Sequence, residues 1–195
     1  MAKRQKRNDP RPGRLRIVAG NWRSRLLDIA DVPGLRPTSE RIRETLFNWL
    51  EPRIHGARCL DLFAGTGALG LEALSRGAAS AVFVEKSMRA VGSLNANIKT
   101  LGAEGAVVRH MHALDYLRGE NTEQFDLVFL DPPFAAGMIV EVCRLLAERK
   151  LLANDARIYI EQARSKADPE LPEGWQVLKN KTAGGVRYML VRQQN

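Results

Sequence analysis

The chain has 195 residues, 45% hydrophobic and 27% charged, which is typical of one soluble domain with its own core. No apolar run approaches the ~20 residues of a membrane span, and no signal core follows the basic N-terminus, so we expect a cytoplasmic protein. Cys59 and Cys143 lack metal-type spacing, and His55, His110 and His112 lack ligand periodicity, which predicts free core thiols and no metal site.

The formal net charge of +8 is concentrated at the N-terminus. Residues 1–25 contain nine basic residues and a single acidic one, whereas the remaining chain has 21 of each sign. Such an arm attracts phosphate backbones and releases counterions on contact, which favours RNA or DNA as partner over a merely solubilising tail. The candidate RNA contacts are Lys3, Arg4, Lys6, Arg7, Arg11, Arg14, Arg16, Arg23 and Arg25.

The segment 1–35 is predicted to be an extension before the main domain. Residues 1–13 are polar, rich in proline and without periodicity, so we expect them to be disordered. Residues 15–19 and 24–29 resemble two short strands of a hairpin, joined by a turn that contains Trp22. Trp22 is a candidate for stacking on a base, and membership of a small apolar cluster is an equal alternative.

The segment 36–50 is predicted to open the main domain with a helix. Thr38 or Ser39 can cap its N-terminus, and Ile42, Leu46 and Leu50 lie on one apolar stripe. We expect Pro52 to end this helix.

A glycine-rich turn follows a buried strand over residues 59–63 and opens a helix that extends to about residue 76. Gly65, Gly67 and Gly70 let a ligand approach the backbone, and the helix start offers free N–H groups. The glycine spacing equally fits dinucleotide-binding folds, in which an acid such as Glu85 binds the ribose.

Asp61 favours one ligand over the other. A carboxylate beside the turn suits an ammonium group and would repel a pyrophosphate. S-adenosylmethionine carries an ammonium and a sulfonium and no phosphate, so we predict it as the cofactor, with Asp61 on the ammonium and Glu85 on the ribose. A nicotinamide oxidoreductase is the competing interpretation.

From residue 58 onward, predicted strands and helices alternate. The further strands are expected at 81–84, 106–110, 125–130 and 156–161, and the helices at 87–101 and 138–149, with a short turn through Leu114 and Leu117. Repeated units of this kind predict an α/β fold with a parallel sheet and ligands at the carboxyl ends of the strands. Two final strands, 175–178 and 186–191, read as an antiparallel hairpin.

Asp131-Pro132-Pro133-Phe134 follows the fourth predicted strand directly. The lone pair of an exocyclic base amine is delocalised into the ring, so its N–H groups need acceptors, which the Asp131 carboxylate and the Pro132 carbonyl can supply. The prolines fix the direction of that carbonyl, and Phe134 would stack on the base. Most of the predicted acceleration therefore comes from positioning and preorganised acceptors.

These stretches together resemble the RsmD-type bacterial methyltransferases. The resemblance includes the Leu-Arg-Ile-Val-Ala-Gly hairpin, the segment from Arg36 to Leu50, the glycine turn, the Asp-Pro-Pro-Phe site and the closing Ala-Gly-Gly-Val, and it covers residues 14–192. It implies a Rossmann-like class I methyltransferase fold over residues 36–195, with a seven-stranded, mostly parallel sheet. It also implies methylation of a guanine at N2 in 16S ribosomal RNA of a partly assembled small subunit, by a chain that we expect to be monomeric.

The resemblance also assigns further cofactor contacts. These are Arg36, Thr38, Phe63, Ala64, Lys86, His112 and Ala113, although Lys86 and Ser87 are also typical of a helix start. Family members often place an acidic residue against the adenine where this chain has His112, and Asp115 is a candidate substitute. DNA adenine and a protein glutamine amide remain alternative acceptors, although a separate recognition domain or a long helical N-terminal domain would be expected for them.

Overall fold

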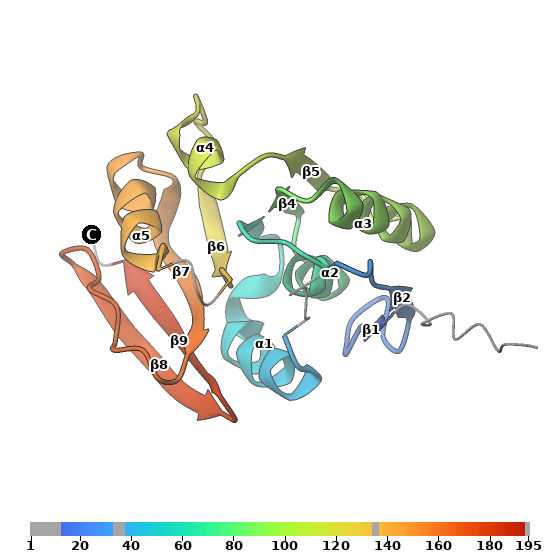
Figure 1. Ribbon diagram of the computed structural model, residues 1–195, viewed down its shortest axis with the longest axis horizontal. Coiled ribbons are helices and arrows are strands. Elements are labelled where there is room, and N and C mark those ends of the chain that lie inside the picture. The colour runs from blue at the N-terminus through green and yellow to red at the C-terminus, as the bar shows by residue number, and fades with distance from the viewer. Residues whose placement is uncertain (1–12, 33–37, 134–136, 194–195) are drawn as a thin grey trace, which may run out of the picture.

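The computed structural model describes residues 13–32, 38–133 and 137–193, which form two sheets and five helices (Figure 1). The strands are β1 (Arg14–Arg16), β2 (Leu26–Asp28), β3 (Arg58–Asp61), β4 (Ser80–Glu85), β5 (Ala106–His110), β6 (Phe125–Leu130), β7 (Leu152–Ala163), β8 (Trp175–Ala183) and β9 (Val186–Gln193). The helices are α1 (Glu40–Ile54), α2 (Ala68–Ser75), α3 (Met88–Leu101), α4 (Ala113–Arg118) and α5 (Ile139–Glu148).

The main sheet has seven strands in the order β5-β4-β3-β6-β7-β9-β8. The first five of these strands are parallel, whereas β9 pairs antiparallel with both β7 and β8. The predicted fold class, including the closing hairpin, is therefore confirmed. The strand order changes direction between β3 and β6, and ligands of open α/β sheets bind in the crevice at such a switch point.

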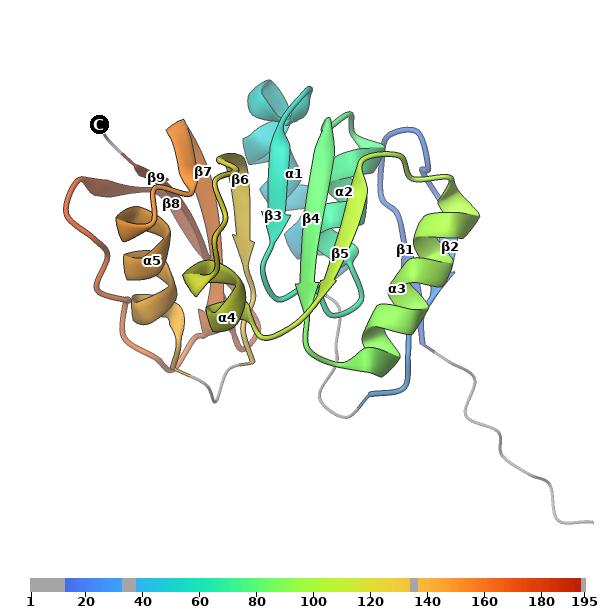
Figure 2. The same ribbon diagram turned by 90° about the horizontal axis from the view of Figure 1, so that it is seen from above.

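Alternating side chains of the parallel strands build a separate core on each face of the sheet. Cys59 of β3 and Phe83 of β4 belong to the cluster that packs against α1, α2 and α3. Leu60 of β3 and Val82 of β4 belong to the other cluster, which includes side chains of α4 and α5. Figure 2 shows α4 and α5 on one side of the sheet, with α1 and α2 on the other.

The N-terminal hairpin of β1 and β2 shares the first of these cores. Leu15, Ile17, Leu27 and Ile29 are buried in the same cluster as α1 and α2. The predicted hairpin is confirmed as an antiparallel pair, with strands shorter than expected. Its apolar side chains therefore pack on the main sheet's helices.

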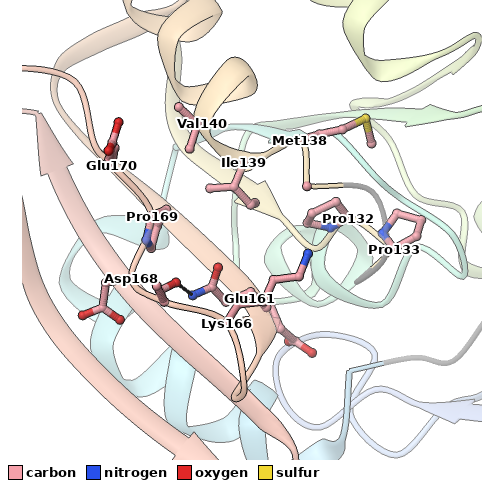
Figure 3. Close-up of a pocket in the computed structure, with 13 residues that line it drawn as sticks. Pro132, Pro133, Met138, Ile139, Val140, Glu161, Lys166, Asp168, Pro169 and Glu170 are labelled. Atoms are coloured by element: carbon pink, nitrogen blue, oxygen red, sulfur yellow. Dashed lines mark hydrogen bonds between the residues drawn. The ribbon is translucent and has the colours of Figure 1, made fainter.

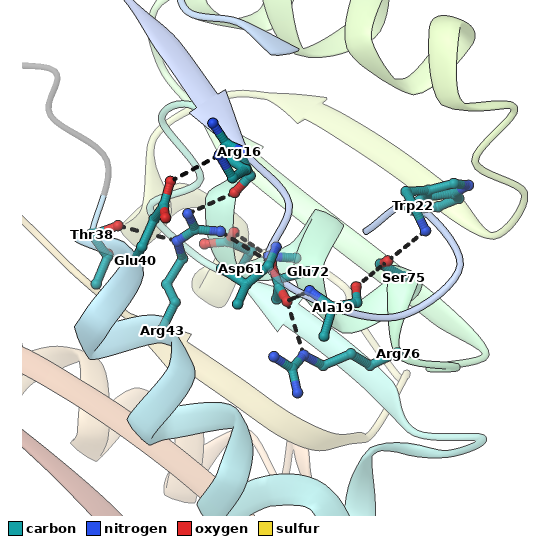
Figure 4. Close-up of polar contacts among 12 residues, drawn as sticks. Arg16, Ala19, Trp22, Thr38, Glu40, Arg43, Asp61, Glu72, Ser75 and Arg76 are labelled. Atoms are coloured by element: carbon teal, nitrogen blue, oxygen red, sulfur yellow. Dashed lines mark hydrogen bonds and ion pairs between the residues drawn. The ribbon is translucent and has the colours of Figure 1, made fainter. Parts of the chain in front are cut away.

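A buried carboxylate on α2 fastens the hairpin to the main sheet's helices (Figure 4). Glu72 accepts hydrogen bonds from the backbone N–H groups of Val18 and Ala19, at 2.8 and 2.9 Å. The same carboxylate forms an ion pair with the buried guanidinium of Arg43, at 3.1 Å. That guanidinium also donates to the Arg16 carbonyl of the hairpin, at 2.8 Å. The hairpin thus supplies hydrogen-bond partners to both members of a buried ion pair, and buried charges left without partners are costly, so we expect the hairpin to be firmly docked.

Several predicted boundaries were wrong: β3 ends at Asp61 and not at residue 63, β7 begins at Leu152 and not at 156, and β8 continues to Ala183 and not only to 178. Helix α1 begins after its cap Ser39, as expected, but continues through Pro52 to Ile54. Pro52 lacks a backbone N–H and so costs the helix one hydrogen bond, but the buried side chain of Ile54 anchors the last turn to the core. Cys59 and Cys143 are buried free thiols, as predicted. None of the helices in the described part of the chain is long and apolar enough to cross a membrane.

Candidate functional site

The glycine turn between β3 and α2 forms one wall of the candidate site. Gly67 has a left-handed φ of +76°, and a Cβ there would come within 2.4 Å of the Leu94 side chain. Gly70 lies where a Cβ would come within 2.3 Å of Phe83, so only glycine lets α2 pack this closely on β4. The turn therefore brings its backbone to the edge where β3 ends.

Asp61, the last residue of β3, is a buried carboxylate behind this turn. Its Oδ2 accepts the N–H of Gly70 at 3.0 Å. The pKa of Asp61 is raised to about 7, chiefly by burial and to a smaller extent by the charges of Asp131 and Glu85, while the Gly70 hydrogen bond acts in the opposite direction. A buried acid of this kind gains most from a cationic partner, so it fits the ammonium group predicted from the sequence.

Glu85, the last residue of β4, is held against the same turn. Its Oε2 accepts the N–H of Gly65 at 2.8 Å, and its Oε1 accepts the N–H of Ser87 at 2.6 Å. Two backbone amides thus fix the carboxylate in the loop that opens α3. Each oxygen keeps a second lone pair, so the group can still accept from a ribose hydroxyl.

Asp131 follows β6, the neighbour of β3, and lies at the same edge as the glycine turn. Its Oδ2 accepts a hydrogen bond from the hydroxyl of Thr38 at 3.2 Å. Burial raises the pKa of Asp131, and the Thr38 hydroxyl partly offsets that effect. The structure therefore joins Thr38, predicted to bind cofactor, to the predicted catalytic carboxylate. Pro132 is buried and Pro133 exposed beside it.

A second buried carboxylate, Glu161 on β7, was missed by the sequence analysis. The hydroxyl of Tyr159 donates to its Oε2 at 2.7 Å. Burial and the nearby charge of Asp131 both raise the pKa of Glu161. The sequence did contain a signal for Glu161. It is an acidic residue at the end of a predicted apolar strand, directly after the core residues Tyr159 and Ile160, and so close to the edge where ligands bind.

The remaining predicted cofactor contacts differ in how far their side chains are exposed to solvent. Ala64 is buried and donates its N–H to the Val84 carbonyl at 3.0 Å, whereas Phe63 and Ala113 are half-buried. Lys86 and His112 are exposed, and the His112 side chain makes no capping hydrogen bond to α4. The predicted contacts Arg36 and Phe134 lie outside the described residues.

The predicted RNA contacts of the hairpin divide into two groups. Arg14, Arg16, Arg23 and Arg25 are exposed. Trp22 is half-buried and packs against the core cluster of α1 and α2, which favours the alternative of an apolar cluster over base stacking. The contacts predicted at Lys3, Arg4, Lys6, Arg7 and Arg11 lie outside the described residues.

This sheet order, with its glycine turn after β3 and acid after β4, defines a class I methyltransferase fold. The family described as conserved hypothetical protein 95 matches residues 15–192. Ribosomal RNA small subunit methyltransferase D of Escherichia coli is 44% identical over 97% of this chain and 96% of the relative. The protein of the same name from Haemophilus influenzae is 46% identical over 91% and 93%.

The chain belongs to this family of ribosomal RNA small subunit methyltransferase D proteins. The solved structure of Escherichia coli yhhF superposes with a TM-score of 0.87 at 42% identity. The superposition covers 93% of this chain and 99% of that chain, so hairpin, sheet and closing strands share one arrangement.

Proposed function

We propose that this protein transfers a methyl group from S-adenosylmethionine to the N2 amine of a guanine in 16S ribosomal RNA, within an assembling small subunit in the cytoplasm. The observation that carries the proposal is the Asp131-Pro132-Pro133 segment at the same sheet edge as the glycine turn. The names of the relatives support ribosomal RNA as the substrate class.

The residues of the turn fit S-adenosylmethionine by their chemistry. Asp61 is a buried acid suited to the methionyl ammonium, and Glu85 is a fixed acceptor suited to the ribose hydroxyls. Gly65 and Gly67 give the cofactor access to the backbone, and Thr38, Phe63 and Ala113 would complete its surroundings. When bound, the cofactor supplies an electrophilic methyl group on its sulfonium.

The chain's own task is to make the amine nucleophilic and to hold it in line. Asp131 accepts one N–H of the amine and the Pro132 carbonyl accepts the other, which draws the nitrogen away from planarity. The half-buried setting of Asp131 strengthens these hydrogen bonds, because less water competes for the carboxylate. The amine loses its proton after transfer, so positioning provides most of the acceleration.

A direct test offers tritiated S-adenosylmethionine to the purified protein together with under-methylated small-subunit particles, free 16S RNA and DNA in parallel. Nucleoside analysis of the labelled product should yield N2-methylguanosine from the particles. Label in methyladenine of DNA, or in a protein glutamine, would refute the proposed acceptor and support one of the alternatives.

The basic N-terminal arm should supply part of the affinity for RNA. Deleting residues 1–12 removes Lys3, Arg4, Lys6, Arg7 and Arg11. Each phosphate contact contributes roughly 0.7–0.9 to the slope of log affinity against log salt, so the deletion should make that slope shallower by up to about 4. Fluorescence anisotropy with labelled RNA at several salt concentrations measures it, and an unchanged slope would contradict the role of the arm.

A further inference from the structure

A cavity of about 410 Å³ opens beside the Asp131 segment, a size within the usual range of small-molecule pockets. Its walls come from the end of β6, the start of α5 and the segment that follows β7 (Figure 3). They include Pro132, Pro133, Met138, Ile139, Glu161 and Lys166. No described residue of the glycine turn lines it, so this cavity lies on the acceptor side of the two prolines.

Glu161 is an acidic group in the wall of this cavity, although only 5% of the residue is exposed. Burying a carboxyl group among apolar neighbours is costly, and an apolar residue of similar size is often at least as stabilising. The Tyr159 hydroxyl fixes the group by donating to Oε2. Glu161 is thus an acceptor whose burial is unfavourable for stability and whose orientation in a cavity wall is fixed. Such a group indicates a ligand that carries a hydrogen-bond donor.

Asp131 and Glu161 directly follow Leu130 and Ile160, which are paired between the neighbouring parallel strands β6 and β7, so the two acids lie side by side. In keeping with this, the charge of Asp131 raises the pKa of Glu161. Thr38 lies at this edge as well, because its hydroxyl donates to Asp131 at 3.2 Å. Two acceptors therefore stand next to each other at the end of the sheet. A base that enters the cavity would meet Glu161 in its wall, and Asp131 directly precedes the wall residue Pro132.

We propose that Glu161 is a base-recognition residue whose carboxylate accepts the N1–H of the target guanine while Asp131 and Pro132 accept its N2 amine. This inference rests on the proposed guanine-N2 activity. Guanine presents N1–H and N2–H as adjacent donors, whereas a purine without N1–H turns a lone pair toward the Glu161 carboxylate. A buried acceptor left unpaired, or opposed by a lone pair, rejects such an analogue strongly.

The test compares two bases that share the reactive amine. Small-subunit particles are reconstituted with 16S RNA that carries either guanine or 2-aminopurine at the methylated position, introduced on a ligated synthetic segment. 2-Aminopurine retains the N2 amine but has a lone pair at N1. The wild-type protein should favour guanine in kcat/KM by on the order of 100-fold.

The Glu161→Gln variant should lose most of this preference. Its amide can turn an N–H toward the lone pair of 2-aminopurine, so the ratio between the two bases should fall at least about tenfold, mainly through faster methylation of 2-aminopurine. Glu170→Gln is the matched control, because Glu170 lines the same cavity but is exposed. That control should keep the wild-type ratio.

Tyr159→Phe provides a second variant in case the first fails to fold. It removes only the hydroxyl that orients Glu161, so the ratio should fall a few-fold while cofactor affinity stays near wild type, with only a moderate loss of thermal stability from the unpaired acceptor. If the wild-type protein makes no N2-methylguanosine, the proposed function itself fails. If it does so and both variants keep the wild-type ratio, only the role of Glu161 is overturned.

Discussion

The two halves of the active edge hold their carboxylates by different kinds of hydrogen bond. Around the glycine turn, Asp61 and Glu85 accept from the backbone amides of Gly70 and Gly65. Backbone donors are fixed by the fold itself, so these two acids keep one position whether or not a ligand is present. This half of the site therefore suits the cofactor, which is the same molecule in every turnover.

Beyond β3, the acids are held by side-chain hydroxyls. Thr38 donates to Asp131, and Tyr159 donates to Glu161. A hydroxyl can rotate away and give its acceptor to an incoming base, so this half can exchange partners during each turnover. The comparison teaches that the donor cofactor should be recognised by backbone geometry, and the acceptor base by replaceable side-chain contacts.

Replacing the acceptor-side acid should have the largest effect and should leave the other half intact. Asp131→Ala removes an acceptor for the reacting amine, so kcat should fall by roughly 10³-fold. Cofactor affinity, measured by calorimetry with S-adenosylhomocysteine, should stay within about threefold, because the variant does not touch the glycine turn. A variant that still transfers methyl groups at the normal rate would contradict the mechanism.

The reciprocal change should weaken cofactor binding. Asp61→Asn can still accept the Gly70 N–H but loses the charge for the ammonium, so the dissociation constant should rise on the order of 30-fold, the usual worth of a charged hydrogen bond. Calorimetry measures this directly. Asp131→Asn serves as the matched control, and equal affinities for the two variants would break the comparison.

Stability should also depend on pH through Asp61. Its pKa is raised to about 7 in the folded chain, against about 3.9 in the unfolded chain, so folding favours the protonated form. That stability is fully present below pH ~4 and is lost as the pH rises through about 7. Urea unfolding from pH 5 to 8 should therefore show falling stability, with a shallower fall in Asp61→Asn. Identical slopes would exclude this origin.

The smallest effect is expected from Thr38→Val, which removes one hydroxyl and keeps the shape. Because the Thr38 hydrogen bond lowers the pKa of Asp131, its loss should move the acidic limb of kcat/KM upward from its wild-type position near pH 6. At pH 7 the rate should drop about threefold. A pH profile with an unmoved limb would show that the hydroxyl plays no part in setting Asp131.

The features that the sequence predicted well are those with continuous local signals. The buried strand before the turn, predicted at 59–63 and observed at Arg58–Asp61, the glycine turn and the Asp-Pro-Pro segment are each contiguous, so their order along the chain predicted that they meet at one sheet edge. Glu161 was not predicted because its significance depends on Asp131, which lies beside it only through the pairing of β6 with β7. The end of α1 was misplaced because tertiary packing of Ile54 outweighed the local preference of Pro52.

The Arg43 and Glu72 pair was not foreseen for the same reason. Glu72 sits in an apolar helix sequence, and its partners come from residues far along the chain, including the N–H groups of Val18 and Ala19. In a sequence, such a contact shows itself only as a charged residue within an otherwise apolar stretch. This indicates that the residue has a partner in the folded protein but does not identify which residue the partner is.

The arrangement around Glu72 sets a limit on how far the protein can be shortened. Two of the four donors that meet this carboxylate are hairpin amides, so a chain starting at α1 would keep a buried negative charge with half its partners gone. Trimming that stops before Gly13 leaves all four of these hydrogen bonds in place, and we expect it to change only the affinity for polyanions. Trimming that passes Ala19 removes two of the four donors, so we expect it to destabilise the main sheet's helices as well.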